Sequence, residues 1–246
     1  MAEGPATAGH YLRSAILAVP AIGVAFLAYV YLTLPDVRAL KTTNPATTAF
    51  MELRDREARG AGRTPRRVQR WVSYGRISPD LKRAVLVAED DAFFQHEGVD
   101  FEQLQESIEF DWARGRFSRG GSTITQQLAK NLYLSPSRSP VRKLRELVIA
   151  RRLEAELKKA RIFEIYLNVI EWGDGVYGVE SAARMYFQKP AAELGPAEAA
   201  LLAGAIVNPR VLNPARPTAR LVRRQQLILR RMGSVIPPRE SAQLER

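Results

Sequence analysis

Apolar residues recur along most of the chain at the spacing of one helical face. Residues 81–88 show such a stripe, and Ser78 and Pro79 before it form a helix start signal with serine as the N-cap. The same helical pattern recurs in 141–158, 196–207 and 218–232. Alternating patterns typical of half-buried strands are hard to find. The pattern predicts a mostly α fold.

The most apolar stretch, residues 14–34, has no charged residue in 21 positions. At about 1.5 Å per residue, a helix of this length spans roughly 30 Å, the thickness of a membrane's hydrocarbon core. The favoured interpretation is an N-terminal transmembrane helix. A cleaved signal peptide is the alternative, although its apolar core is usually shorter. Arg13 before the stretch and Arg38 and Lys41 after it leave the orientation open.

Residues 36 to about 75 contain scattered proline and glycine and are typical of a tether that leads into a folded domain. This segment also contains an arginine-rich run, Arg63, Arg66, Arg67 and Arg70. A solvated loop and a contact for lipid phosphates are both open interpretations of the run.

Charge and the content of cysteine and histidine limit the kinds of partner and site that the chain can have. The chain carries 37 Lys and Arg against 26 Asp and Glu, and the net charge of +11 favours an anionic partner such as nucleic acid, phospholipid or a phosphorylated substrate. The absence of cysteine excludes a disulfide scaffold, a thiolate nucleophile and a cysteine-ligated zinc site. The two histidines, His10 and His96, argue against a histidine-rich metal site.

Two polar segments are candidates for chemistry. Glu89, Asp90 and Asp91 directly follow the stripe of 81–88, although like charges at a helix C-terminus oppose its dipole. Proteins retain such an unfavourable charge arrangement mainly at functional sites, so the three acids are a candidate site. The alternative interpretation is a solvated helix end without a function. Residues 120–131, GGSTITQQLAKN, resemble a ligand-binding turn that runs into a helix. A capped glycine loop is the alternative, and the spacing excludes a P-loop.

A basic stretch runs from Arg138 to Arg161, with nine Lys and Arg against three Glu. Arg142 and Lys143 lie four and three residues before Glu146, so they can pair with it on a helix surface. The excess of positive charge would still be unpaired. A bound phosphate explains this excess better than a solvated helix face.

Four segments follow one another as EDDAFFQHEGVD (89–100), GGSTITQQLAKN (120–131), RKLRE (142–146) and IFEIYLNVIEWGDGVYGVESAARMYF (162–187). In order and spacing they resemble the motifs of the peptidoglycan glycosyltransferases. Each motif alone has limited specificity, but the set is highly specific, and the resemblance covers roughly residues 66–235. The chain looks like the monofunctional members, because it stops near Arg246 with no room for a transpeptidase domain.

The resemblance implies a lysozyme-like helical glycosyltransferase domain with a small membrane-proximal lobe, preceded by one N-terminal transmembrane helix. We therefore expect a short cytoplasmic tail and anchor in 1–35, a linker in 36–65 and the glycosyltransferase domain in 66–246. The resemblance also implies a single-pass protein of the cell inner membrane, with the catalytic domain in the periplasm.

The implied activity is polymerisation of lipid II, a disaccharide-pentapeptide on undecaprenyl diphosphate, into β-1,4-linked glycan strands. The reaction inverts the anomeric carbon, releases undecaprenyl diphosphate and involves no transpeptidation. Glu89 matches the family's general base and Glu146 its second glutamate, whose role is open between orienting cations, holding a metal and assisting departure. The substrate-binding residues that the resemblance implies are Asp90, Phe93, His96, Ser122, Thr123, Gln126, Gln127, Lys130, Arg138, Arg142 and Lys143.

His96 lies beside acids, where a structural hydrogen-bond partner is favoured over a catalyst. No cofactor is firmly implied, although a divalent cation, Mg²⁺ or Mn²⁺, could accompany the diphosphate. The expected partners are lipid II, the lipid-linked growing chain and the inner membrane, with other cell-wall synthesis or division proteins left open and nucleic acid excluded.

Two other functions compete with this one. A lytic enzyme needs a general acid, and its substrate has no diphosphate for the cations to bind. A membrane-anchored nucleic-acid-binding or scaffold protein would be supported by aromatic residues among the basic ones, and 138–161 contains none.

Overall fold

The structure is a computed structural model that describes residues 18, 20–26, 28–98, 121–137, 139–235 and 237. The chain divides into two compact units, Met1–Asp36 and Val37–Arg246. In the first unit, the described residues from 18 to 32 are helical. No helix in the described ranges is long and apolar enough to cross a membrane. Residues 14–17, 19 and 27 of the expected span lie outside the described residues.

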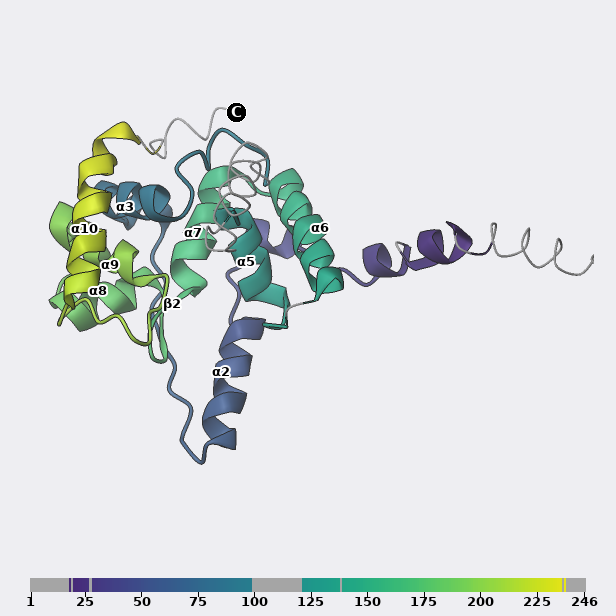
Figure 1. Ribbon diagram of the computed structural model, residues 1–246, viewed down its shortest axis with the longest axis horizontal. Helices are drawn as coiled ribbons and strands as arrows, with labels where there is room; N and C mark the ends of the chain where they lie inside the picture. The colour runs from purple at the N-terminus through teal and green to yellow at the C-terminus, as the bar shows by residue number, and fades with distance from the viewer. Residues whose placement is uncertain are drawn as a thin grey trace, which may run out of the picture. The chain divides into compact units, whose positions relative to one another are not determined.

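The second unit is built mainly from α-helices (Figure 1). They are α2 (Ala49–Gly60), α3 (Pro79–Glu89), α5 (Ile124–Tyr133), α6 (Pro140–Glu156), α7 (Lys159–Val169), α8 (Val179–Phe187), α9 (Pro196–Ala205) and α10 (Ala219–Arg231). Short 3-10 helices lie at Arg38–Lys41, Tyr74–Arg76, Ala191–Glu193 and Met232–Ser234. The predicted mostly α class is confirmed.

Capping residues and proline mark the starts of three helices, including the one that Ser78 and Pro79 predict. The Ser78 hydroxyl oxygen accepts a hydrogen bond from the Asp80 amide at 3.2 Å and caps α3. The Thr218 hydroxyl oxygen accepts from the Leu221 amide at 3.3 Å and caps α10. Pro196 is the first residue of α9, where its missing N–H costs nothing. Local capping chemistry therefore sets where these three helices begin.

Two groups of helices form the second unit. Helices α3 and α10 both pack on α9, and α5 packs on α2, α6 and α7 (Figure 1). The buried face of α3 includes Leu81 and Val85, and that of α5 includes Ile124 and Leu128, all 0% exposed. The C-terminus of α3 and the N-terminus of α5 are the two helix ends that position the site.

The expected linker, residues 36–65, contains a helix. Thr48 caps α2 by accepting from the Met51 amide at 3.1 Å, and Met51 is 0% exposed. This segment therefore belongs to the folded second unit from Val37 onward, in contrast to the tether that the sequence suggests. The helix is mostly polar, AFMELRDREARG, and shows no broad apolar stripe from which it could be predicted.

A small sheet, which the sequence pattern did not predict, has the strand order β1-β3-β2. Strand β1 (Val68–Gln69) runs parallel to β3 (Val176–Tyr177), and β2 (Glu171–Gly173) runs antiparallel to β3. Strands of two or three residues are too short to show alternation. Gly175, between β2 and β3, has a φ of +69°, and an added Cβ there would lie 2.5 Å from the Arg66 carbonyl oxygen. This position therefore requires glycine.

Candidate active site

Glu89 is the last residue of α3, and its side chain is 12% exposed. Its Oε2 accepts a hydrogen bond from Gln127 Nε2 of α5 at 2.9 Å. Arg224 of α10 lies on the other side, with Nη2 3.9 Å from Glu89 Oε1. The carboxylate is thus held between helices that are far apart in sequence.

The environment of Glu89 raises its pKa above the ordinary value of 4.5. Burial is the largest cause, because it disfavours the charged form, and the neighbouring charge of Asp90 acts in the same direction. The Gln127 hydrogen bond and the charges of Arg224 and Lys130 lower the pKa but do not cancel the effect of burial. The sequence predicts a raised pKa from the neighbouring Asp90, but the main physical cause of the raised pKa is burial.

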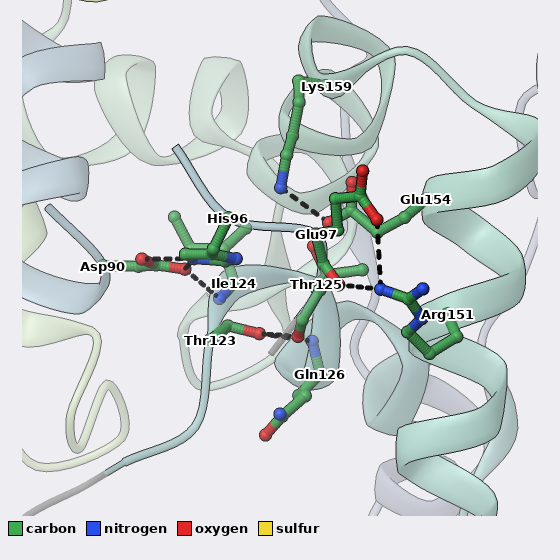
Figure 2. Close-up of polar contacts among 11 residues, drawn as sticks. Asp90, His96, Glu97, Thr123, Ile124, Thr125, Gln126, Arg151, Glu154 and Lys159 are labelled. Atoms are coloured by element: carbon green, nitrogen blue, oxygen red, sulfur yellow. Dashed lines mark hydrogen bonds and ion pairs between the residues drawn. The ribbon is translucent and has the colours of Figure 1, made fainter. Parts of the chain in front are cut away.

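Asp90 connects the two helix ends (Figure 2). Its side chain accepts from the Ile124 amide at 2.9 Å and contacts His96 Nε2 at 3.0 Å. Ile124 is the first residue of α5, where the positive end of the helix dipole favours an anion. Asp90 is 2% exposed, so it fixes α5 against α3 from within the protein. His96 thus makes the hydrogen-bond contact with an acid that a structural role requires, and its expected contact with substrate stays a prediction.

Phe93 is packed into the core at 0% exposure. The Lys159 ammonium lies 4.2 Å from the centre of its ring and is 2.7 Å from Glu154 Oε1. Glu154 also accepts a hydrogen bond from the Thr125 hydroxyl (Figure 2). Phe93 therefore packs in the core behind the site. The structure does not bring its ring to a surface where substrate could touch it.

Arg142, Lys143 and Glu146 form a second cluster on α6. Arg142 Nη1 and Lys143 Nζ each lie 2.5 Å from a different oxygen of Glu146, which is 3% exposed. The Lys143 ammonium also donates to Ser122 Oγ and Gln126 Oε1, both at 3.2 Å. The pairing of Arg142 and Lys143 with Glu146 that their spacing predicts is thus confirmed, and both cations face one buried carboxylate.

The remaining predicted residues fall on or near α5. The Thr123 hydroxyl caps this helix by accepting from the Gln126 amide at 3.3 Å, and it donates to the Gly98 carbonyl at 2.7 Å. Lys130 is close enough to influence the pKa of Glu89. Arg138 lies outside the described residues. The structure therefore brings Gln127 and Lys130 to Glu89, and Ser122 and Gln126 to the second cluster.

Two residues of the site were missed by sequence reasoning. Arg224 lies in an arginine-rich amphipathic helix, and the sequence pattern of this helix does not predict that Arg224 lies close to Glu89. Tyr166 lies in the last of the four motifs, where its aromatic ring is indistinguishable from core packing. Its hydroxyl in fact donates to Gln127 Oε1 at 3.0 Å.

The described residues contain no group of three or more His, Asp or Glu side chains arranged to hold a metal ion. Both oxygens of Glu146, the acid nearest to the α6 cations, are engaged by Arg142 and Lys143. The divalent cation considered from the sequence stays an untested prediction.

A buried carboxylate with hydrogen-bond support and nearby cations is typical of an enzyme that activates a hydroxyl and handles an anionic group. A family model described as Transglycosylase matches residues 57–233, and the chain belongs to this family. Within it, the chain is a peptidoglycan glycosyltransferase, as its most similar relatives indicate.

Three of these relatives carry the name biosynthetic peptidoglycan transglycosylase. The protein of Laribacter hongkongensis is 48% identical over 229 residues, which cover 92% of this chain and 100% of the relative. That of Dechloromonas aromatica is 49% identical over 195 residues, covering 79% and 84%. That of Aromatoleum aromaticum is 53% identical over 167 residues, covering 68% and 73%.

Proposed function

We propose that the chain polymerises lipid II into β-1,4-linked glycan strands by direct displacement, with inversion at the anomeric carbon. The observation that carries this proposal is Glu89, a largely buried carboxylate of raised pKa that accepts a hydrogen bond from Gln127. A sugar hydroxyl is a poor nucleophile, so a base must take its proton as the hydroxyl attacks. The raised pKa makes Glu89 a stronger base than an exposed glutamate.

The donor in this proposal is the growing chain on its lipid diphosphate, and the acceptor is a new lipid II. The acceptor hydroxyl forms the glycosidic bond, its proton passes to Glu89, and the bond to the diphosphate breaks. Because the bond forms on the face opposite the leaving group, no covalent enzyme intermediate is needed.

Negative charge develops on the departing diphosphate. Lys130, Arg142, Lys143 and the undescribed Arg138 are the cations proposed to stabilise it. Glu146 orients two of these cations through its ion pairs. Ser122 and Gln126 hold Lys143 from the other side, so the Lys143 ammonium is positioned before any ligand arrives.

The remaining finer expectations belong to the same proposal. They are a lysozyme-like fold with a membrane-proximal lobe, an N-terminal anchor in the inner membrane, a periplasmic catalytic domain and the lack of transpeptidation. The support is the set of family motifs together with the 21-residue uncharged stretch at 14–34.

The test is Glu89→Gln in the full chain, purified in detergent and supplied with lipid II. The amide keeps the shape of the carboxylate and can still accept from Gln127, but it cannot take the proton. We expect the polymerisation rate to fall by about 10²–10⁴-fold. Gel separation of glycan products measures the rate, and release of undecaprenyl diphosphate provides a second readout.

Asp91→Asn is the matched control. Asp91 is two residues further along the chain, its side chain is 39% exposed, and it pairs with Arg231 at the surface. Such a pair contributes about 0–1 kcal/mol, so this variant should polymerise at the wild-type rate. If Glu89→Gln remains active while Asp91→Asn does not, the general base is assigned to the wrong carboxylate.

A further inference from the structure

Tyr166, Gln127 and Glu89 form a continuous chain of hydrogen bonds across α7, α5 and α3. The Tyr166 hydroxyl donates to Gln127 Oε1 at 3.0 Å, and Gln127 Nε2 donates to Glu89 Oε2 at 2.9 Å. Tyr166 itself is 0% exposed and does not reach the solvent-facing side of Glu89. Any effect of this hydroxyl on Glu89 therefore passes through Gln127.

The orientation of the Gln127 amide depends on this arrangement. Its NH₂ group faces two acceptors, Glu89 Oε2 and, at 3.4 Å, the Ser122 carbonyl oxygen. Its oxygen faces the Tyr166 hydroxyl. Burial and the charges of Glu89 and Asp90 raise the pKa of Tyr166 well above its ordinary value, so its hydroxyl keeps the proton that it donates. The reversed amide would place a carbonyl oxygen against the Glu89 carboxylate.

We propose that Tyr166 is a positioning residue that, through the Gln127 amide, holds Glu89 ionised and fixed in place for proton abstraction. The hydroxyl satisfies the Gln127 oxygen and thereby keeps the NH₂ group directed at Glu89. This inference rests on the proposed role of Glu89 as the general base. Gln127 then supports the Glu89 carboxylate, in place of the substrate contact that the resemblance implied.

The hydroxyl can be separated from the packing of the ring. The Tyr166 ring lies stacked near Phe163, with ring centres 6.5 Å apart, and a phenylalanine keeps that contact. Tyr166→Phe removes only the oxygen, leaves Gln127 Oε1 without its donor and allows the amide to turn. A turned amide disfavours the charged form of Glu89, so more of the enzyme is protonated at a given pH.

The experiment is a pH profile of lipid II polymerisation by full-length Tyr166→Phe. We expect kcat to fall roughly tenfold, the size of one lost buried hydrogen bond, with KM for lipid II within about twofold of wild type. The acid limb of the profile should move to higher pH. A tyrosine that only filled space would change the melting temperature without moving this limb.

Tyr177→Phe is the matched control. Tyr177 is also 0% exposed, and its hydroxyl has no hydrogen-bond partner among the described residues. This variant removes the same atom from a comparable environment and should keep the wild-type kcat and acid limb. Gln127→Met, which removes the amide and keeps the length of the side chain, should reproduce the acid-limb shift of Tyr166→Phe.

A double variant distinguishes failure of this inference from failure of the proposed function. In a Glu89→Gln background, Tyr166→Phe should cause no further loss, because the group that it positions is gone. A wild-type acid limb in both Tyr166→Phe and Gln127→Met, or an undiminished effect of Tyr166→Phe in the Glu89→Gln background, would overturn the inference alone. Near-wild-type polymerisation by Glu89→Gln would overturn the general base and the inference together.

Discussion

Glu89 is subject to opposing influences within a few ångströms. Burial favours its neutral form, while the Gln127 hydrogen bond and the positive charges of Arg224 and Lys130 favour the carboxylate. The net effect is a raised pKa, which strengthens the base and costs stability wherever the group is charged. Gln127, Lys130 and the neighbouring Asp90 lie in the motifs, whereas burial and the approach of Arg224 from α10 are tertiary properties that the motifs do not show.

The stability cost predicts a pH dependence. A glutamate whose folded-state pKa exceeds its unfolded value destabilises the fold when ionised, and this cost disappears as the pH falls through the folded pKa. Glu89→Gln should therefore unfold at a higher temperature than wild type at pH 7.5, with a smaller difference at pH 4. Thermal unfolding at a series of pH values checks this, and a gain independent of pH would contradict it.

At the scale of helices and strands, the sequence predicts those features that nearby residues determine, such as the starts of helices. Capping residues and proline locate the starts of α3, α9 and α10. The sheet was not predicted because its strands are two or three residues long, although Asp174-Gly175 is a recognisable turn signal. The ion pairs within α6 follow from spacing, but the approach of Lys143 to Ser122 depends on how α5 packs on α6.

Two helix caps should differ in their contribution to stability. Ser78 caps α3 and also donates to the Leu194 carbonyl at 2.6 Å, whereas Thr218 caps α10 near the surface. Thr218→Ala should cost about 1 kcal/mol, the usual cost of a lost cap. Ser78→Ala should cost roughly 2–3 kcal/mol, because it also leaves a buried carbonyl without its donor. Urea unfolding of both variants measures the difference, and equal costs would contradict it.

At the scale of the whole molecule, we expect the second compact unit to bind anionic lipid without residues 1–36. The net charge is +11, and Arg63, Arg66 and Arg70 are exposed on the second unit. Exposed arginines attract anionic lipid head groups over about one Debye length. We therefore expect the arginine-rich run to bind anionic lipid in the absence of residues 1–36.

Deletion of residues 1–36 tests this separation. The remaining chain, which starts at the beginning of the second compact unit, should fold and still bind vesicles of anionic lipid at low salt. Binding should weaken at 0.5 M salt and be weaker on neutral vesicles. Sedimentation with vesicles measures it, with Arg63, Arg66 and Arg70 changed to glutamine as the comparison. Equal binding with and without these arginines would assign the contact elsewhere.

The Glu146 carboxylate is an anion that the chain itself supplies. In the proposed reaction, an arriving diphosphate therefore replaces this internal counter-ion at Arg142 and Lys143. Binding then becomes an ion exchange within the protein that releases few ions to solution, so affinity should depend only weakly on salt concentration. The same carboxylate recovers its cations when the diphosphate leaves, which favours turnover over retention of the product.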